Sequence, residues 1–161
     1  MRRRLAVVLL VCAGGLVLVT NGGAAPAAPS ARPVKVPIVV VKAPDGAIAA
    51  AVKLTIHGHT YGFLIDTGAS VTVVNGPLAH QLGLAPVGKP VKVSGVGCSS
   101  SARIVDLSDW KLAGVTLPAI RAASVKIAGA GGTALGLLGS DVLSRFGAVT
   151  IDYRRAVLTL G

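Results

Sequence analysis

The sequence predicts one domain built almost entirely of β-strands. From Pro37 onward, short runs of Val, Ile and Leu alternate with Gly, Pro and Ser turn signals, which is the pattern of an all-β domain. Hydrophobic residues make up 52% of the 161 residues, enough for one core, whereas aromatic residues make up only 3%. Val and Ile, which are abundant here, favour strands. We therefore expect residues 37–161 to form a single all-β domain.

Residues 1–27 are typical of an export signal. Arg2–Arg4 form a charged start, Leu5–Val19 an apolar segment, and Ala25–Ala27 a small-residue cleavage site. The apolar segment is shorter than the roughly twenty residues of a membrane span, but an uncleaved membrane anchor is the alternative. Residues 28–36 are expected to be a Pro-rich linker. We expect an exported domain that is secreted, or held at a membrane if the signal is not cleaved.

The first half of the domain divides into strands and one short helix. Residues 36–42 form the first expected strand, and residues 52–57 and 60–66 form two more, joined by a hairpin turn at Gly58-His59. After a glycine turn the chain resumes as a strand over residues 71–74. A helix follows, with Gly76 as N-cap, Pro77 as its first residue and Gly83 as its end.

The second half begins with a hairpin over residues 91–107, whose tip holds Gly95 and Gly97. Strands are expected at residues 109–112 and 120–127. A buried strand at residues 135–138 then leads to a second short helix. We expect this helix to be capped by Ser140 and ended by Gly147. A closing hairpin follows, with its turn at residues 153–155.

One carboxylate interrupts the apolar strand in the segment FLIDTGASVTVV, Phe63–Val74. Asp-x-Gly triplets are common turns, so Asp66 could simply accept hydrogen bonds from the backbone where the strand ends. About seventy residues later, the segment GLLGSDVL places two bulky apolar residues and a glycine just before a helix. A glycine at this point allows another backbone to approach closely. The two segments together favour a functional role for Asp66.

With these two motifs, the chain from about Pro37 to Leu160 resembles the retropepsin-like aspartic proteases, particularly the bacterial members with a single aspartyl protease domain. FLIDTGAS resembles the strand and active-site loop of that family. GLLGSDVL resembles its apolar-apolar-glycine segment and the helix that follows. The resemblance implies a closed β-barrel of the acid protease type with a single lobe and two short helices, and it implies no cofactor.

The resemblance also implies a role for each site residue. Asp66 would be the catalytic aspartate. Thr67 would brace the loop against the same loop of a second copy of the chain, and Gly68 would let the substrate pass close. Ser140 stands where retroviral members carry an arginine that helps to lock the dimer. The remaining implied residues are Ala69 and Ser70 in the active-site loop, Gly95, Val96 and Gly97 in a flap, and Leu137, Leu138 and Gly139 as support.

The chemistry of this family needs two carboxylates that share one proton. One acts as a base on water while the other donates a proton to the scissile carbonyl. Only one Asp-Thr-Gly triplet is present, so we expect a homodimer in which Asp66 meets Asp66 and hydrolyses a peptide or protein substrate. The alternative is a monomeric, non-catalytic module that keeps the fold and binds peptides or acts as a scaffold.

Charge and ligand residues argue against other classes of function. The net charge is +10, but beyond the signal Arg154-Arg155 is the only adjacent basic pair, and aromatic residues for base stacking are nearly absent. We therefore expect no nucleic-acid partner. The three histidines have no Glu beside them, so no metal is expected. Without the signal, Cys98 is the one thiol and could form no internal disulfide.

Overall fold

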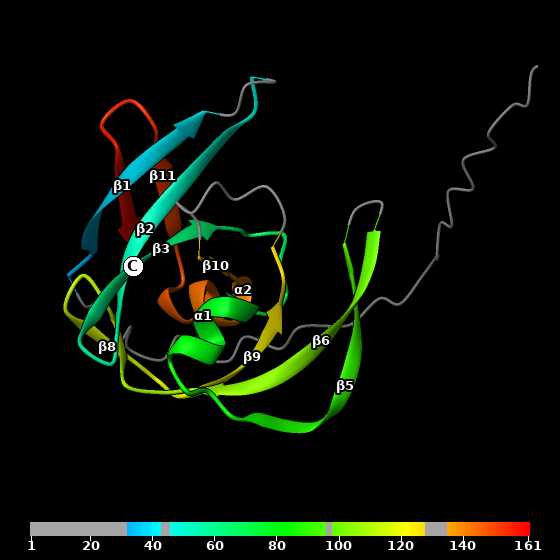
Figure 1. The fold of residues 1–161 in the computed structure, drawn as a ribbon. Coiled ribbons are helices and arrows are strands. Elements are labelled where there is room, and N and C mark those ends of the chain that lie inside the picture. Colours follow the sequence, from blue (N-terminus) through cyan, green and yellow to red (C-terminus); the bar gives the residue numbers. More distant parts are fainter. Residues whose placement is uncertain (1–31, 43–45, 96–97, 128–134) are drawn as a thin grey trace, which may run out of the picture. The chain divides into compact units, whose positions relative to one another are not determined.

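The computed structural model describes residues 32–42, 46–95, 98–127 and 135–161. Within these residues the chain forms twelve strands, two short α-helices and one 3-10 helix (Figure 1). In chain order the strands are β1 (Val34–Lys42), β2 (Ile48–Ile56), β3 (His59–Ile65), β4 (Val73–Asn75), β5 (Pro86–Gly95), β6 (Cys98–Leu107), β7 (Trp110–Leu112), β8 (Val115–Leu117), β9 (Ile120–Val125), β10 (Gly136–Leu138), β11 (Val149–Asp152) and β12 (Val157–Leu160). The helices are α1 (Gly76–Gln81), α2 (Ser140–Leu143) and the 3-10 helix η1 (Ser144–Phe146). The all-β prediction with two short helices is confirmed.

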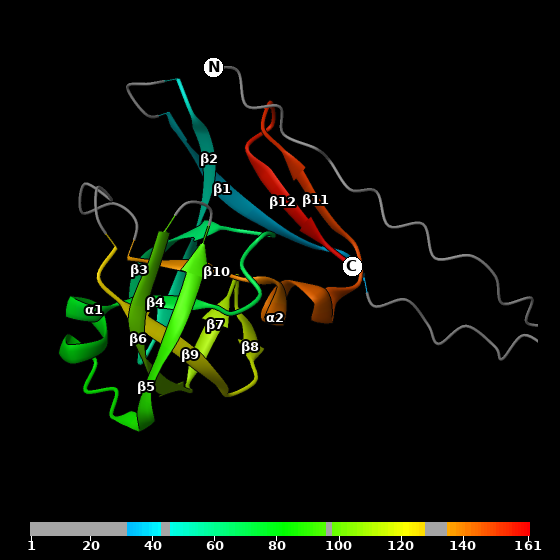
Figure 2. The ribbon, with the colours of Figure 1, turned by 90° about the vertical axis from the view of Figure 1, so that its right-hand side faces the viewer.

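Ten strands follow one hydrogen-bonded path, in the order β11-β12-β1-β2-β3-β10-β4-β9-β6-β5, and β7 pairs with both β2 and β8. The two ends of this path, β11 and β5, are not paired with each other, so the prediction of a closed barrel is wrong in that respect. The reason lies in β1, whose first half pairs with β12 and whose second half pairs with β2. Figure 2 shows that β11 and β12 extend beside β1, away from β5 and β6.

The core is built from the inward-facing residues of the strands, as the two-residue period of a strand requires. Trp110 is fully buried, and its indole Nε1–H donates a hydrogen bond to the Pro118 carbonyl oxygen at 2.9 Å. Burying one Leu or Phe side chain contributes about 1.5–3 kcal/mol, so the core supplies most of the driving force for folding. Core side chains that are at most 1% exposed include Val52, Leu54, Phe63, Leu107, Trp110, Leu112, Leu138 and Leu158.

Several element boundaries differ from the sequence prediction. β1 begins at Val34, so the last three residues of the expected linker pair with β12 instead. The β2–β3 turn lies at His57-Gly58, one residue earlier than expected, and both residues have positive φ, 48° and 82°. Positive φ at both central residues is characteristic of a type I′ turn, whose twist matches that of the flanking strands. The short strand β8 was not predicted.

The starts of both helices also lie one residue before the predicted positions. Asn75 is the N-cap of α1, and its side-chain Oδ1 accepts the Ile127 N–H at 3.2 Å. Ser140 is the first residue of α2 and Gly139 is its N-cap. Gly83 and Gly147 follow the helices with positive φ, 65° and 75°, as expected for helix ends. No helix among the described residues is long and apolar enough to cross a membrane.

Candidate active site

The loop that contains Asp66 connects two strands that do not pair with each other. β10 lies between them, parallel to β3 and antiparallel to β4. In this arrangement Leu138 pairs with Ile65, the residue before Asp66, and Leu137 pairs with both Leu64 and Val73. A segment about seventy residues away therefore separates the two strands, and residues 66–72 must cross from one side of β10 to the other.

The Asp66 carboxylate shapes the start of this loop. Its Oδ1 accepts the backbone N–H of Gly68 at 3.0 Å and that of Ala69 at 3.1 Å. Oδ2 accepts no hydrogen bond from the part of the chain that the structure describes, so this oxygen is free to meet water or another molecule. Asp66 and Ala69 are half-buried, whereas Thr67, Gly68 and Ser70 are exposed. The turn interpretation of the triplet is thus correct locally, and it leaves one carboxylate oxygen for chemistry.

The residues Leu138–Asp141, which we call the clasp segment, hold the loop from the other side. The Asp66 N–H donates to the Leu138 carbonyl oxygen at 3.0 Å, and the Ser140 N–H donates to the Ala69 carbonyl oxygen at 2.8 Å. The Ser140 hydroxyl donates to the Thr67 carbonyl oxygen at 2.7 Å. Ser140 was predicted to cap α2, but its hydroxyl serves as a donor to the loop.

Thr72 closes the loop and was not identified from the sequence. It is fully buried, and no other described polar or charged residue falls in the buried class. Its Oγ1 accepts the Gly139 N–H at 3.1 Å and donates to Asp141 Oδ1 at 2.7 Å. The signal that could have revealed it is its position two residues before the buried Val74, on the inward side of an apolar run.

Two glycines allow the backbones of this region to meet. A Cβ at Gly139 would lie 2.8 Å from the Val71 carbonyl carbon and 2.9 Å from the Thr72 nitrogen. A Cβ at Gly136 would overlap the Phe63 ring and the Val73 carbonyl oxygen. The close backbone approach expected at the glycine before α2 is therefore present, and Gly136 is a second such position. The predicted supporting residues Leu137 and Leu138 are half-buried and fully buried.

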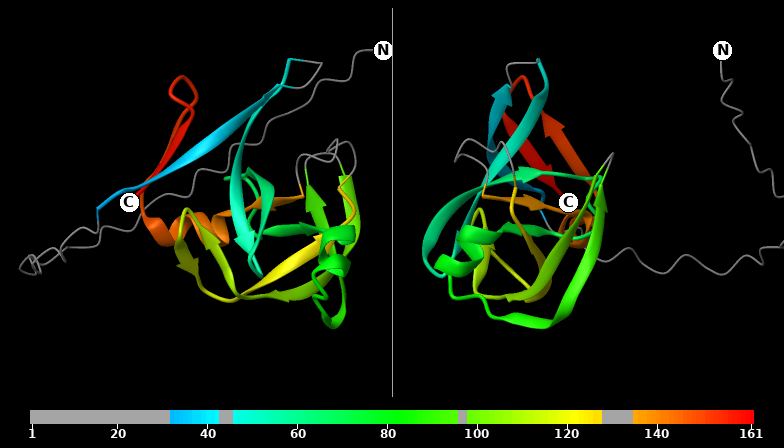
Figure 3. Two further views of the ribbon diagram at one scale, coloured as in Figure 1. Left: turned by 60° about the vertical axis from the view of Figure 1, so that its left-hand side comes forward. Right: turned by 45° about the vertical axis from the view of Figure 1, so that its right-hand side comes forward.

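The predicted flap is the hairpin of β5 and β6. The last five residues of β5 pair with the first five of β6, while β6 pairs with β9 only from Arg103 to Leu107. The outer part of the hairpin is thus a two-stranded ribbon among the described residues, and Figure 3 shows the hairpin in green at the margin of the fold. Gly95 ends β5. Val96 and Gly97 lie outside the described residues.

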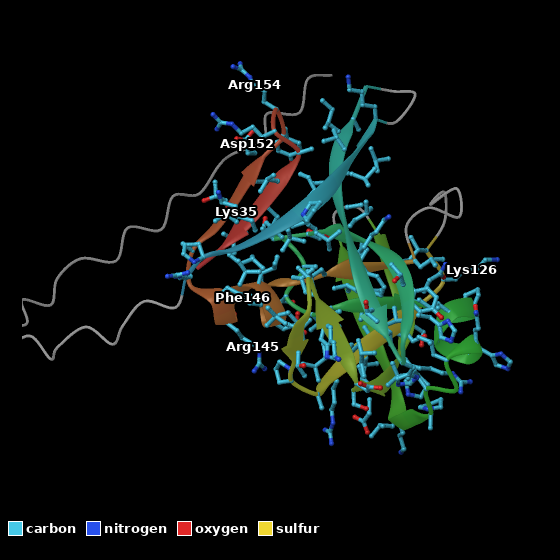
Figure 4. The ribbon with its side chains drawn as sticks, turned by 90° about the vertical axis from the view of Figure 1, so that its left-hand side faces the viewer. Lys35, Lys126, Arg145, Phe146, Asp152 and Arg154 are labelled. Atoms are coloured by element: carbon cyan, nitrogen blue, oxygen red, sulfur yellow. The ribbon has the colours of Figure 1, made fainter. Side chains whose placement is uncertain are left out.

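The remaining candidate residues lie elsewhere. His57 and His59 are exposed at the β2–β3 turn, and the described residues contain no group of three or more His, Cys, Asp or Glu that could hold a metal ion. Asp141 is in the first turn of α2, as expected. Asp152 is at the β11–β12 turn, as expected, where the Arg155 backbone N–H lowers the pKa of its carboxyl. Figure 4 shows Asp152 and Arg154 far from Arg145, which follows α2.

Comparisons with known proteins agree with this geometry. Residues 52–142 match the model of a family described as aspartyl protease, a range that runs from β2 to α2 and includes both Asp66 and the clasp segment. Among matching solved structures is the crystal structure of a retropepsin-like aspartic protease from Rickettsia conorii. It is 20% identical over 80% of this chain and 89% of that chain, with a TM-score of 0.53, which shows a shared fold. A comparison with curated proteins found no match.

Proposed function

The chain belongs to the aspartyl protease family and has the retropepsin-like fold, and from this we propose that it is an endopeptidase whose active site forms between two copies of the chain. Each copy would contribute Asp66. The observation that carries the proposal is the state of that carboxylate: Oδ1 is held by two backbone N–H groups, and Oδ2 accepts no bond from the described residues.

The need for a second copy follows from the positions of the other described aspartates. Asp106 is exposed and lies 3.9 Å from the Arg121 guanidinium. Asp109 is exposed between β6 and β7, Asp141 accepts the Thr72 hydroxyl, and Asp152 pairs with Arg155 at the far hairpin. None of these four carboxylates forms a hydrogen bond with Asp66 itself. A two-fold dimer supplies a matching carboxylate by symmetry.

In the proposed reaction the two Asp66 carboxyl groups share one proton and hold a water between them. The ionised carboxylate removes a proton from the water as its oxygen attacks the scissile carbonyl carbon, and the protonated carboxyl donates its proton to the carbonyl oxygen. The carboxyl that took the water proton then gives it to the amide nitrogen, while the other carboxylate takes a proton from a hydroxyl of the intermediate. The C–N bond breaks, the amine and the acid are released, and the pair again holds one proton. The exposed Thr67 and Gly68 would face the partner copy and the peptide.

The β5–β6 hairpin would act as the flap over the bound peptide, with Gly95, Val96 and Gly97 at its tip. Its support is the ribbon geometry, since a two-stranded segment without further pairing opens at low energetic cost. We also propose that residues 1–27 direct export, so that hydrolysis of the substrate takes place outside the cytoplasm. A peptide or protein segment in extended conformation is the proposed substrate.

The first test compares two strand-ending aspartates. The purified protein is offered a mixture of peptides, and products are identified by mass spectrometry. Asp66→Asn should lower kcat/KM by roughly 10³-fold or more, because an amide can neither act as the base nor share the proton. Asp152→Asn, far from the site, should retain full activity. Cleavage by Asp66→Asn at the wild-type rate would exclude Asp66 as the catalytic residue.

The second test separates the dimeric enzyme from a chain that acts alone. Wild-type and Asp66→Asn subunits are mixed and allowed to exchange. If each site needs two copies of Asp66, random pairing of equal amounts leaves roughly one quarter of the activity of the same total amount of wild-type protein. If the activity instead falls to about one half, each chain carries its own site, and the dimer proposal is wrong.

A further inference from the structure

A single peptide unit connects the two ends of the Asp66 loop. The Leu138 carbonyl oxygen accepts the Asp66 N–H at 3.0 Å, and the Gly139 N–H donates to Thr72 Oγ1 at 3.1 Å. These two groups belong to the same peptide unit, which is planar and strongly resists twisting. A tilt of this unit at Thr72 is therefore transmitted to the Asp66 backbone.

The orientation of the Thr72 hydroxyl decides how firmly that unit is held. A hydroxyl has one proton to donate, and here it is donated to Asp141 Oδ1 at 2.7 Å. With the proton directed at Asp141, a lone pair of Oγ1 faces the Gly139 N–H. Thr72 is fully buried, and its bond with the Gly139 N–H is buried as well, so water does not compete for that bond.

Resting on the proposed function, we propose that Thr72 and Asp141 are positioning residues that set the placement of Asp66. Neither side chain needs to contact the substrate, because the chain of bonds Asp141–Thr72–Gly139/Leu138–Asp66 reaches the catalytic residue through the backbone. In a two-fold dimer any displacement of Asp66 occurs in both copies. The separation of the two carboxylates then changes by as much as twice the displacement in one copy.

The test uses two disruptive variants and two conservative ones. Thr72→Val keeps the shape but removes the hydroxyl, and Asp141→Ala removes its acceptor. Thr72→Ser keeps the hydroxyl, and Asp141→Asn keeps an acceptor oxygen. The exposed Thr150 on β11 provides a matched control, Thr150→Val. Initial rates are measured well below the melting temperature, at concentrations where dilution does not change specific activity, and folding is checked by circular dichroism.

We expect Thr72→Val and Asp141→Ala to lower kcat by roughly 10- to 100-fold with KM changed less than about 2-fold, because geometry and not substrate binding is lost. Thr72→Ser, Asp141→Asn and the control should stay within about 3-fold of wild type. The double variant Thr72→Val/Asp141→Ala should be no slower than Thr72→Val alone, because both changes break the same chain of bonds. A purely structural role predicts a lower melting temperature with unchanged kcat in the folded protein, and that result would overturn the proposal.

A second readout does not depend on catalysis. Amide hydrogen exchange at Asp66 should be faster in Thr72→Val and Asp141→Ala than in their Ser and Asn counterparts. If the wild-type protein cleaves no peptide, the proposed function fails while this exchange difference still decides the positioning role. If Thr72→Val does not fold, the comparison of Asp141→Ala with Asp141→Asn, at a half-buried position, decides the positioning role by itself. Equal exchange in disruptive and conservative variants would contradict the inference.

Discussion

The turns that follow Asp66 and Asp152 use the same local hydrogen bond in different settings. In the first, Asp66 Oδ1 accepts the N–H of Ala69, three residues later. In the second, Asp152 Oδ1 accepts the N–H of Arg155 at 2.8 Å, again three residues later. Each aspartate stands at the end of a strand, where such a side chain commonly stabilises the turn.

The difference lies in what else holds each turn. The Asp152 turn is closed by its own sequence neighbour, since the Arg155 guanidinium also lies 3.1 Å from Asp152 Oδ2. Both carboxylate oxygens of Asp152 are therefore engaged. The Asp66 turn is held by the clasp segment instead, and its carboxylate keeps Oδ2 without a bond from the described residues. Holding a turn through a distant segment leaves its carboxylate available for chemistry.

The largest effect is expected from disturbing β10, the strand that leads into the clasp segment and lies between β3 and β4. Gly136→Ala should lower the free energy of unfolding by about 3 kcal/mol or more, because the new methyl group overlaps both the Phe63 ring and a backbone oxygen of β4. Denaturant unfolding measures the loss. Repacking of Phe63 alone cannot relieve it, since the Val73 carbonyl oxygen is part of the sheet.

Gly76→Ala provides the control for that variant. At the first position of α1 a Cβ would come no closer than 3.8 Å to Val125, and the backbone there does not have positive φ. The change should be neutral or stabilise the protein by up to about 1 kcal/mol through reduced freedom of the unfolded chain. A loss at this position as large as that of Gly136→Ala would show that the overlap with Phe63 and Val73 is not the cause of the loss at Gly136.

A smaller effect is expected when one bond of the clasp is removed. Ser140→Ala deletes the donor to the Thr67 carbonyl oxygen, a contact at an exposed position, and should cost about 0.5–1.5 kcal/mol in stability. It should also lower kcat, because Thr67 adjoins Asp66, the proposed catalytic residue, whereas Arg155→Ala at the other turn should leave kcat unchanged. Equal kcat values for the two variants would mean that the clasp only stabilises the fold.

The smallest effect concerns the pH dependence of the Asp152 turn. The Arg155 backbone N–H, with its guanidinium, lowers the pKa of Asp152 below the ordinary 3.8. A lowered pKa in the folded state contributes stability above the ordinary value, and that contribution is lost as pH falls through the lowered pKa. Asp152→Asn should thus be slightly less stable than wild type at neutral pH and equal to it in strong acid. Urea unfolding at both pH values checks this, and a gap that widened in acid would contradict it.

The sequence carried enough information for the local parts of this fold. Alternation of apolar residues located most strands, Gly83 and Gly147 marked the ends of both helices, and the two motifs identified the loop and the segment that clasps it. Such features depend on neighbours in sequence, which a linear pattern records. The prediction that the two motifs lie together in one site came from the family resemblance.

The missed features depend on contacts that no local pattern encodes. The Thr72–Asp141 bond spans 69 residues. In the run SVTVV, Thr72 cannot be told from an ordinary strand residue, because threonine is common in strands. Ser140 has the sequence properties of an N-cap, yet its hydroxyl donates a hydrogen bond to a carbonyl oxygen of the distant loop. The open path of the sheet likewise follows from β1 pairing with β12 at the far end of the chain.

Among the residues that the structure describes, β5 pairs only with β6, and its other edge has a consequence for how the protein behaves in crowded solution. An unpaired strand can add to the edge strand of another molecule and begin aggregation. β5 carries Lys89 and Lys92, which are exposed, and Pro86 and Pro90, which have no N–H to donate. An irregularity in its pairing between Val87 and Val91, with Gly88 at a φ of 71°, further distorts the edge. These residues protect the hairpin from joining other molecules, so that it can stay open to solvent at high protein concentration.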